Sequence, residues 1–139
     1  MRQGVSATPG AVETLATLRE RGYRIGLISN TIWPSELHLE DLEEIGVLPY
    51  LDHMIFSGEL GIWKPNAAIF RHSLEALGAP PEQAIFVGDS PHEDIRGAQA
   101  VGMRAVWVRS VEFPLGDVQP DGLVETLPEL LPMLEQWNA

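Results

Sequence analysis

Two carboxylates lie close together in the stretch VGDSPHEDIRGA, residues 87–98. Asp89 directly follows an apolar run and a glycine, and Asp94 comes five residues later, at the expected start of a helix. Mg²⁺ prefers oxygen ligands and is commonly bound by one or two carboxylates together with substrate phosphates. The pair therefore indicates a magnesium site or, about equally, a helix cap and a first-turn charge that only stabilise the helix.

Hydroxyl and ammonium groups follow other apolar stretches of the chain. Ser29 and Asn30 end the run YRIGLISN, Ser57 follows HMIF, and Lys64 comes further on. Hydroxyls, backbone N–H groups and a lysine together suit a phosphate. Each of these residues alone is more typical of a turn, a cap or a solvated charge. Their order along the chain, serine, lysine, then the aspartate pair, favours a phosphate and metal site.

Apolar segments and helix signals alternate along the chain, which predicts an α/β layered fold with parallel strands. In such sheets ligands bind beyond the carboxyl ends of the strands, where the candidate residues fall. Expected strands cover residues 23–29, 53–58, 84–88, 104–108 and, weakly, 122–125. Expected helices cover residues 8–22, 35–46, 66–78, 94–101 and 127–136, with caps at Ser35 and Asn66.

Composition narrows the functional class. The length of 139 residues and a hydrophobic content of 45% predict one domain over residues 1–139. Nine basic against twenty acidic residues give a net charge of -11, which argues against nucleic acid as a partner. No stretch is long and apolar enough for a membrane span or a signal peptide, so we expect a soluble, cytoplasmic protein. The absence of cysteine excludes thiolate catalysis, and the four histidines lack zinc-site spacing.

Three segments resemble motifs II, III and IV of the haloacid dehalogenase superfamily, in its Mg²⁺-dependent phosphohydrolase branch. They are IGLISN, GIWKPNAAIF and IFVGDSPHEDIRGAQAVGM, and the similarity runs from Pro9 to about Val108. The resemblance implies a Rossmann-like three-layer parallel sheet. It also implies a phosphatase, similar to phosphoglycolate phosphatases, that acts on a small phosphorylated metabolite through an aspartyl-phosphate.

The resemblance also implies a role for each candidate residue. Ser29 would hydrogen-bond the transferring phosphoryl group, with help from the amide of Asn30, and Lys64 would neutralise charge. Asp89 would bind Mg²⁺ directly or through water, and Asp94 would complete or orient the metal ligands. The acidic residue at position 89 favours phosphate chemistry over carbon–halogen cleavage. A receiver-type signalling domain would place its acid, hydroxyl and lysine in a different order.

The first motif of that family, Asp-x-Asp at the end of a central strand, does not occur in these 139 residues. We therefore expect a truncated core whose first central strand and nucleophile are absent. The gap could be closed by direct pairing of the flanking strands, by residues 1–8, or by a strand from another chain, so self-association or strand exchange is expected. The chain is expected to be inactive alone. The alternative is a non-catalytic remnant that acts as a phosphate-binding, Mg²⁺-binding or interaction module.

Overall fold

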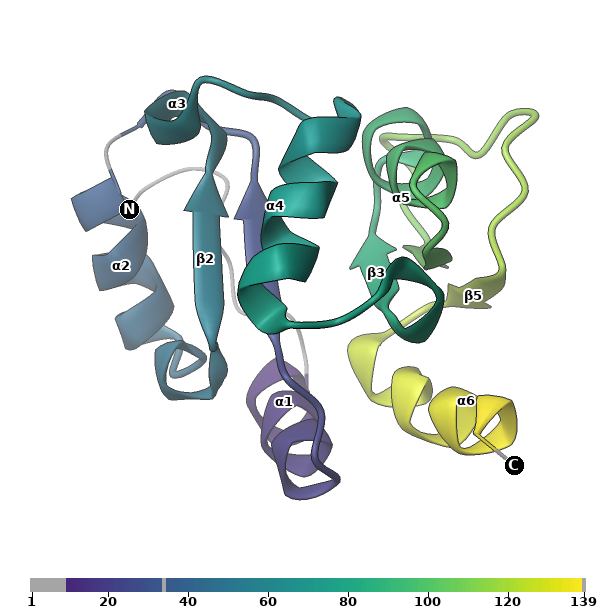
Figure 1. Ribbon diagram of the computed structural model, residues 1–139. Coiled ribbons are helices and arrows are strands. Elements are labelled where there is room, and N and C mark those ends of the chain that lie inside the picture. The colour runs from purple at the N-terminus through teal and green to yellow at the C-terminus, as the bar shows by residue number, and fades with distance from the viewer. Residues whose placement is uncertain (1–9, 34, 139) are drawn as a thin grey trace. The chain divides into compact units, whose positions relative to one another are not determined.

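The computed structural model describes residues 10–33 and 35–138 (Figure 1). Contacts within the chain divide it into two compact units, each with its own parallel sheet. Unit 1 comprises Met1–Gly61 and Thr126–Ala139, and unit 2 comprises Ile62–Glu125. The expectation of a single domain over residues 1–139 stays a prediction.

Unit 1 is built on two short parallel strands, which lie side by side in Figure 1. β1 (Gly26–Ser29) pairs with β2 (His53–Phe56) in a register that sets Ser29 opposite Phe56. Ile28 of β1 and Ile55 of β2 are both buried. These helices are α1 (Ala11–Glu20), α2 (Ser35–Glu44), η1 (Leu48–Tyr50), α3 (Ser57–Leu60), η4 (Leu127–Glu129) and α6 (Leu130–Trp137).

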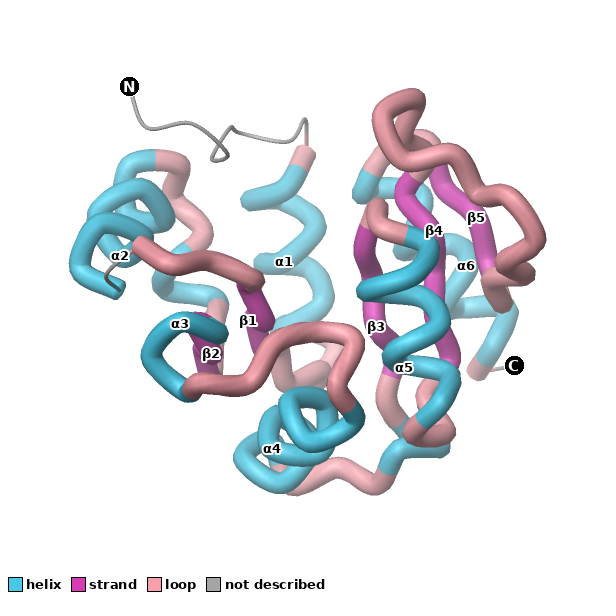
Figure 2. The backbone as a smooth tube through the Cα atoms, turned by 90° about the horizontal axis from the view of Figure 1, so that it is seen from above, coloured by secondary structure: helices cyan, strands magenta, loops and turns pink. Residues whose placement is uncertain are grey.

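Unit 2 contains a three-stranded parallel sheet in the order β3-β4-β5. The strands are β3 (Ile85–Gly88), β4 (Arg104–Val108) and β5 (Gly122–Val124). The other elements are α4 (Ala67–Leu77), η2 (Pro81–Gln83), the π-helical segment η3 (Pro91–Arg96) and α5 (Gly97–Ala100). Figure 2 shows α5 alongside this sheet, and η3 packs against β3 and β4.

The central strand of unit 2 is buried without alternation. Ala105, Val106 and Trp107 follow one another in β4, and all three are buried. Successive side chains of a strand point to opposite faces, so both faces of the sheet are covered, as is typical of parallel sheets. The apolar, non-alternating strands in the sequence and the parallel pairing confirm the predicted α/β class.

Strand pairing bears on the expectation of a sheet that lacks its central strand. In the part of the chain that the structure describes, β1 pairs with β2 alone and β3 with β4 alone. The strands that would flank a missing central strand, β1 and β3, belong to different units, so their direct pairing stays a prediction. Residues 1–8, the second possibility, lie outside the described residues, and a strand from another chain stays a prediction.

Several element boundaries differ from those expected. The helix expected to start at Asp94 begins at Pro91, because proline fits the first turn of a helix and Ser90 caps it, accepting the Glu93 N–H at 3.3 Å. The strand expected through residue 58 ends at Phe56, and the short α3 follows it. Ser35, the expected cap, is the first residue of α2. The expected helix start at residues 8–9 lies outside the described residues.

Among the described residues, no helix has the length and apolar character needed to cross a membrane.

Candidate functional site

Lys64 and Asp94, which lie 30 residues apart in the sequence, form an ion pair. Lys64 Nζ donates to Asp94 Oδ1 at 2.7 Å, and the two side chains are only 10% and 7% exposed. The other carboxylate oxygen, Oδ2, accepts the backbone N–H of Ser90 at 3.1 Å. Because both oxygens accept hydrogen bonds, the Asp94 carboxylate is held in one orientation.

The end of β3 and the wide turn of η3 position Asp94. The backbone N–H groups of Asp94 and Ile95 both donate to the carbonyl of Ser90, at 2.9 and 3.3 Å. This sharing brings the Asp94 carboxylate back over the last residue of β3, Gly88. A Cβ at position 88 would lie 2.5 Å from Asp94 Cγ, so only glycine leaves room for the carboxylate there.

Two aromatic rings support Lys64. Its Nζ lies 5.6 Å from the centroid of the Phe86 ring, within the range of a cation–π contact. Phe86 in turn meets Phe70 of α4 edge to face, with 5.1 Å between ring centroids. A Cβ at Gly97 would lie 2.6 Å from Phe70, so this glycine allows α5 to approach α4 closely. Packing contacts thus connect Lys64 with β3, α4 and α5.

Asp89 has a different environment from Asp94, because it is exposed. Its backbone carbonyl accepts the indole N–H of Trp107 at 2.8 Å, and Trp107 is 6% exposed. A buried tryptophan usually finds a partner for its N–H, and here that partner is the residue directly after β3. The backbone at Asp89 is therefore fixed while its carboxylate faces solvent.

Ser29 and Asn30 lie at the carboxyl end of β1 in unit 1, and both are half-buried. Lys64, Asp89 and Asp94 belong to unit 2, so the approach of Ser29 and Asn30 to them stays a prediction. The structure thus joins Lys64 and Asp94 in an ion pair, and it places Asp89 directly after β3 in the same unit. Ser57, the other hydroxyl expected at the ends of the strands, is fully buried, and its Oγ accepts the N–H of Thr31 at 2.8 Å.

A model of the haloacid dehalogenase-like hydrolases matches residues 2–102, which is more than half of the chain. The chain belongs to this family. The fold agrees, because the chain is similar to a solved HAD phosphatase from Thermococcus onnurineus with a TM-score of 0.80 and 36% identity, over 91% of this chain and 57% of that one. The predicted family and the Rossmann-like core are both confirmed.

Two curated relatives of this haloacid dehalogenase-like chain are phosphatases. A phosphoserine phosphatase from Thermus thermophilus is 39% identical over 129 residues, which cover 86% of this chain and 51% of that protein. A glyceraldehyde 3-phosphate phosphatase from Pyrococcus furiosus is 37% identical over 139 residues, which cover 94% of this chain and 55% of that protein. The chain spans about half the length of these relatives.

The donor atoms of this haloacid dehalogenase-like site suit Mg²⁺, which keeps water ligands, better than a metal ion that is coordinated by protein side chains alone. Within the described ranges no three His, Cys, Asp or Glu side chains gather into a metal-binding group. Asp89 and Asp94 supply oxygen only, and one of the two is exposed. Mg²⁺ keeps several waters and needs only one or two carboxylates. The two aspartates match that requirement, whereas structural zinc sites are built from cysteine and histidine ligands.

Sequence reasoning missed the residues that fix the site. No pattern in the sequence indicates that the indole N–H of Trp107 donates to the Asp89 carbonyl. Gly88 and Phe86 lie inside an apolar strand, where nothing in the pattern shows that one makes room for Asp94 and the other faces Lys64. The one available signal was a glycine at the last position of an apolar run, which often marks a close approach.

Proposed function

We propose that Lys64, Asp89 and Asp94, with Ser29 and Asn30, form the phosphate- and Mg²⁺-binding part of a phosphatase site for a small phosphorylated metabolite. The buried pair of Lys64 and Asp94 beside the exposed Asp89 carries the proposal. The phosphatase names of the relatives above support it.

Each residue has a task that its surroundings suit. Asp94, held by Lys64 and the Ser90 amide, orients the site and keeps the ammonium beside it. Asp89 offers the exposed carboxylate for Mg²⁺, which when bound would bridge to phosphate oxygens and neutralise their charge. Lys64 contributes a positive charge toward the phosphoryl group, and the Ser29 hydroxyl and Asn30 amide would donate to its oxygens.

Turnover needs one more group. The 139 residues contain no Asp-x-Asp, the element that supplies the nucleophile in the family resemblance. We therefore expect these residues alone to bind phosphate and Mg²⁺ without hydrolysing a phosphoester. With p-nitrophenyl phosphate, no Mg²⁺-dependent release of p-nitrophenol above background is expected. A rate above background that Lys64→Ala abolishes would contradict this expectation.

Binding can be followed at one atom, because Lys64 is the only lysine of the 139 residues. Lysine labelled with ¹³C at Cε should therefore give a single NMR signal from residue 64. That signal should move on addition of inorganic phosphate with MgCl₂, and should stay in place with NaCl at equal ionic strength. An unmoved signal at millimolar phosphate would contradict the proposed site.

The absence of Asp-x-Asp also favours a second candidate, a phosphate- or Mg²⁺-binding module without catalysis. The two candidates differ in what the gene encodes upstream of Met1. An in-frame Asp-x-Asp after an apolar strand favours the phosphatase, and the longer protein should then hydrolyse a small phosphoester with Mg²⁺. A stop codon directly upstream favours the binding module.

A further inference from the structure

The turn that follows β1 is held through a single residue, Thr31. Its backbone N–H donates to Ser57 Oγ at 2.8 Å, and its carbonyl accepts the N–H of Gly58 at 2.9 Å. Its hydroxyl accepts the N–H of Trp33 at 3.1 Å and lies 2.9 Å from His38 Nε2. Every polar atom of Thr31 therefore has a partner, and the partners come from the turn itself, α2 and α3.

The hydrogen bond between Thr31 and Ser57 is shielded from water. Thr31 is 9% exposed and Ser57 is fully buried. Leaving a buried N–H without its acceptor costs more free energy than the hydrogen bond itself contributes, so any other conformation of the turn is unfavourable. The network therefore selects one conformation of the residues directly after Ser29 and Asn30.

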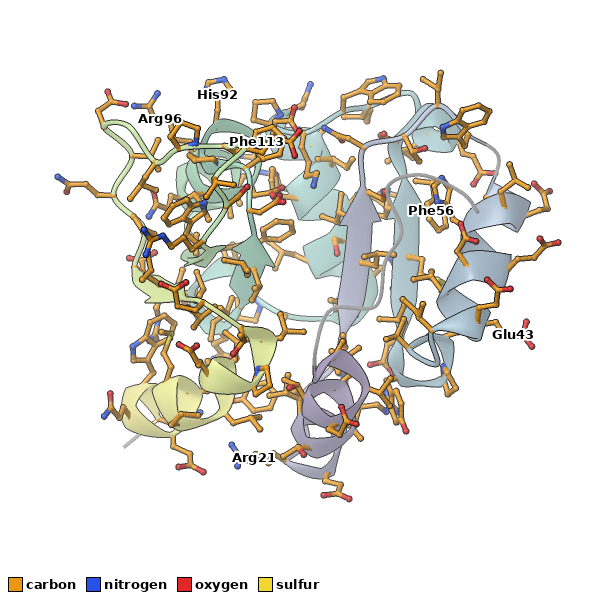
Figure 3. All side chains as sticks on the ribbon, turned by 180° about the vertical axis from the view of Figure 1, so that it is seen from behind. Arg21, Glu43, Phe56, His92, Arg96 and Phe113 are labelled. Carbon is orange, nitrogen blue, oxygen red and sulfur yellow. The ribbon has the colours of Figure 1, made fainter. Side chains whose placement is uncertain are left out.

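Two further features show that the turn and α3 are fitted together. A Cβ at Gly58 would lie 2.5 Å from the Thr31 carbonyl oxygen and 3.2 Å from Ile32 Cα, so the backbones meet where only glycine fits. The ring of His38 stacks on Phe56, with 5.1 Å between centroids and 13° between planes. Figure 3 shows Phe56 pointing from β2 toward α2, the helix that carries His38. This stacking fixes the ring whose nitrogen meets the Thr31 hydroxyl.

We propose that Thr31 is a positioning residue for phosphate binding, held by Ser57 and His38 so that the Ser29 hydroxyl and the Asn30 amide are fixed before the ligand arrives. This inference rests on the proposed function, which assigns Ser29 and Asn30 to the phosphate. Fixing donors in advance removes the entropic cost of ordering them on binding, so loosening the turn should weaken binding without removing any ligand-contacting group.

Two matched pairs of variants test this assignment in the 139-residue chain. Thr31→Val removes the hydroxyl at nearly constant shape, whereas Thr31→Ser keeps it. Ser57→Ala removes the acceptor of the Thr31 amide, whereas Ser73→Ala removes a buried hydroxyl in α4 of unit 2. Thr31→Val and Ser57→Ala should weaken inorganic phosphate binding roughly five- to tenfold, the size of one lost hydrogen bond. Thr31→Ser and Ser73→Ala should stay within about twofold of the unmodified chain.

Equal phosphate affinity in Thr31→Val and Thr31→Ser would overturn the assignment. If the unmodified chain binds no phosphate, the proposed function fails, and amide hydrogen exchange in the free protein then decides on the turn. Exchange at Gly58 that is faster in Ser57→Ala than in Ser73→Ala supports the network, and equal exchange overturns it. If Thr31→Val does not fold, His38→Phe takes its place, because it keeps a ring on Phe56 but loses the nitrogen that contacts the Thr31 hydroxyl. Its control is His72→Phe, at an exposed position of α4.

Discussion

Lys64 Nζ and Asp94 Oδ1 lie 2.7 Å apart, in a pair whose side chains are both at least nine-tenths shielded from water. Such a pair differs from the exposed pair of Arg96 and Asp117, whose side chains are 48% and 87% exposed. Figure 3 shows Arg96, the last residue of η3, at the surface. Desolvation makes the buried pair sensitive to the loss of either partner, whereas an exposed pair contributes little.

The first prediction follows from that contrast. Asp94→Asn removes the carboxylate that pairs with the buried Lys64 ammonium and should lower the free energy of unfolding by about 3 kcal/mol in urea denaturation. Asp117→Asn, the control in the exposed pair, should change it by less than about 1 kcal/mol. The double variant Lys64→Met with Asp94→Leu should recover most of the loss. Similar losses in Asp94→Asn and Asp117→Asn would show that the pair is not buried in solution.

The second prediction concerns the room that Gly88 leaves for the Asp94 carboxylate. Gly88→Ala should destabilise the chain by about 1–3 kcal/mol, the usual cost of overpacking, because its methyl group would displace Asp94. In an Asp94→Gly background the same change should cost much less, since the obstructing atoms are gone. Thermal unfolding of the four chains gives the coupling. Equal costs in both backgrounds would place the carboxylate elsewhere.

The third prediction tests the hydrogen bond from Trp107 to the Asp89 carbonyl. Trp107→Phe keeps a buried ring but loses the indole N–H, and should cost about 1–3 kcal/mol because a carbonyl is left without its donor. The backbone ¹⁵N–¹H signals of Asp89 and Ser90 should shift. Trp33→Phe, at an exposed position in the turn after β1, should leave both signals unchanged. Unmoved signals in Trp107→Phe would contradict the contact.

The fourth prediction is a pH dependence at Asp52, the residue directly before β2. The Ile25 N–H, donating at 2.7 Å, and then the Arg19 guanidinium, at 2.6 Å, hold the pKa of Asp52 below its ordinary value of 3.8. Because the folded pKa is the lower one, the stabilisation is present above pH 3.8 and is lost as the pH falls through the folded pKa. As the pH is lowered through that acidic range, the urea concentration at the unfolding midpoint should decrease more for the unmodified chain than for Asp52→Asn. Parallel curves would contradict this assignment.

Much of the fold could be predicted because its signals are local. The helix after Asn66 was expected from its cap and its apolar spacing, and Asn66 Oδ1 does accept the Ala68 N–H at 2.9 Å. Its end at Gly78, where φ is 69°, was marked by the glycine itself. The four-residue α3 could not be predicted, since so short a segment shows no helical period.

The site was predicted as residue types but not as contacts. That Lys64 and Asp94 would pair across 30 residues follows from tertiary packing, which no local pattern encodes. Ser57 was expected among the hydroxyls at the ends of the strands, yet it is buried against Thr31, because burial depends on α3 and the turn together. The approach of Ser29 to Lys64, Asp89 and Asp94 stays a prediction.

The central claim is the proposal that Asp89 offers its carboxylate to Mg²⁺ beside an Asp94 that orients the site. The most direct test is an MgCl₂ titration of the ¹⁵N-labelled chain, followed at the amide signals of residues 88–90 and 92–95. In the unmodified chain these signals should shift and saturate. In Asp89→Asn the shifts should need at least about tenfold more Mg²⁺, whereas Asp117→Asn, which removes a charge at another exposed position of unit 2, should titrate like the unmodified chain. Equal titration of all three chains, or shifts spread evenly over the acidic surface, would contradict the claim.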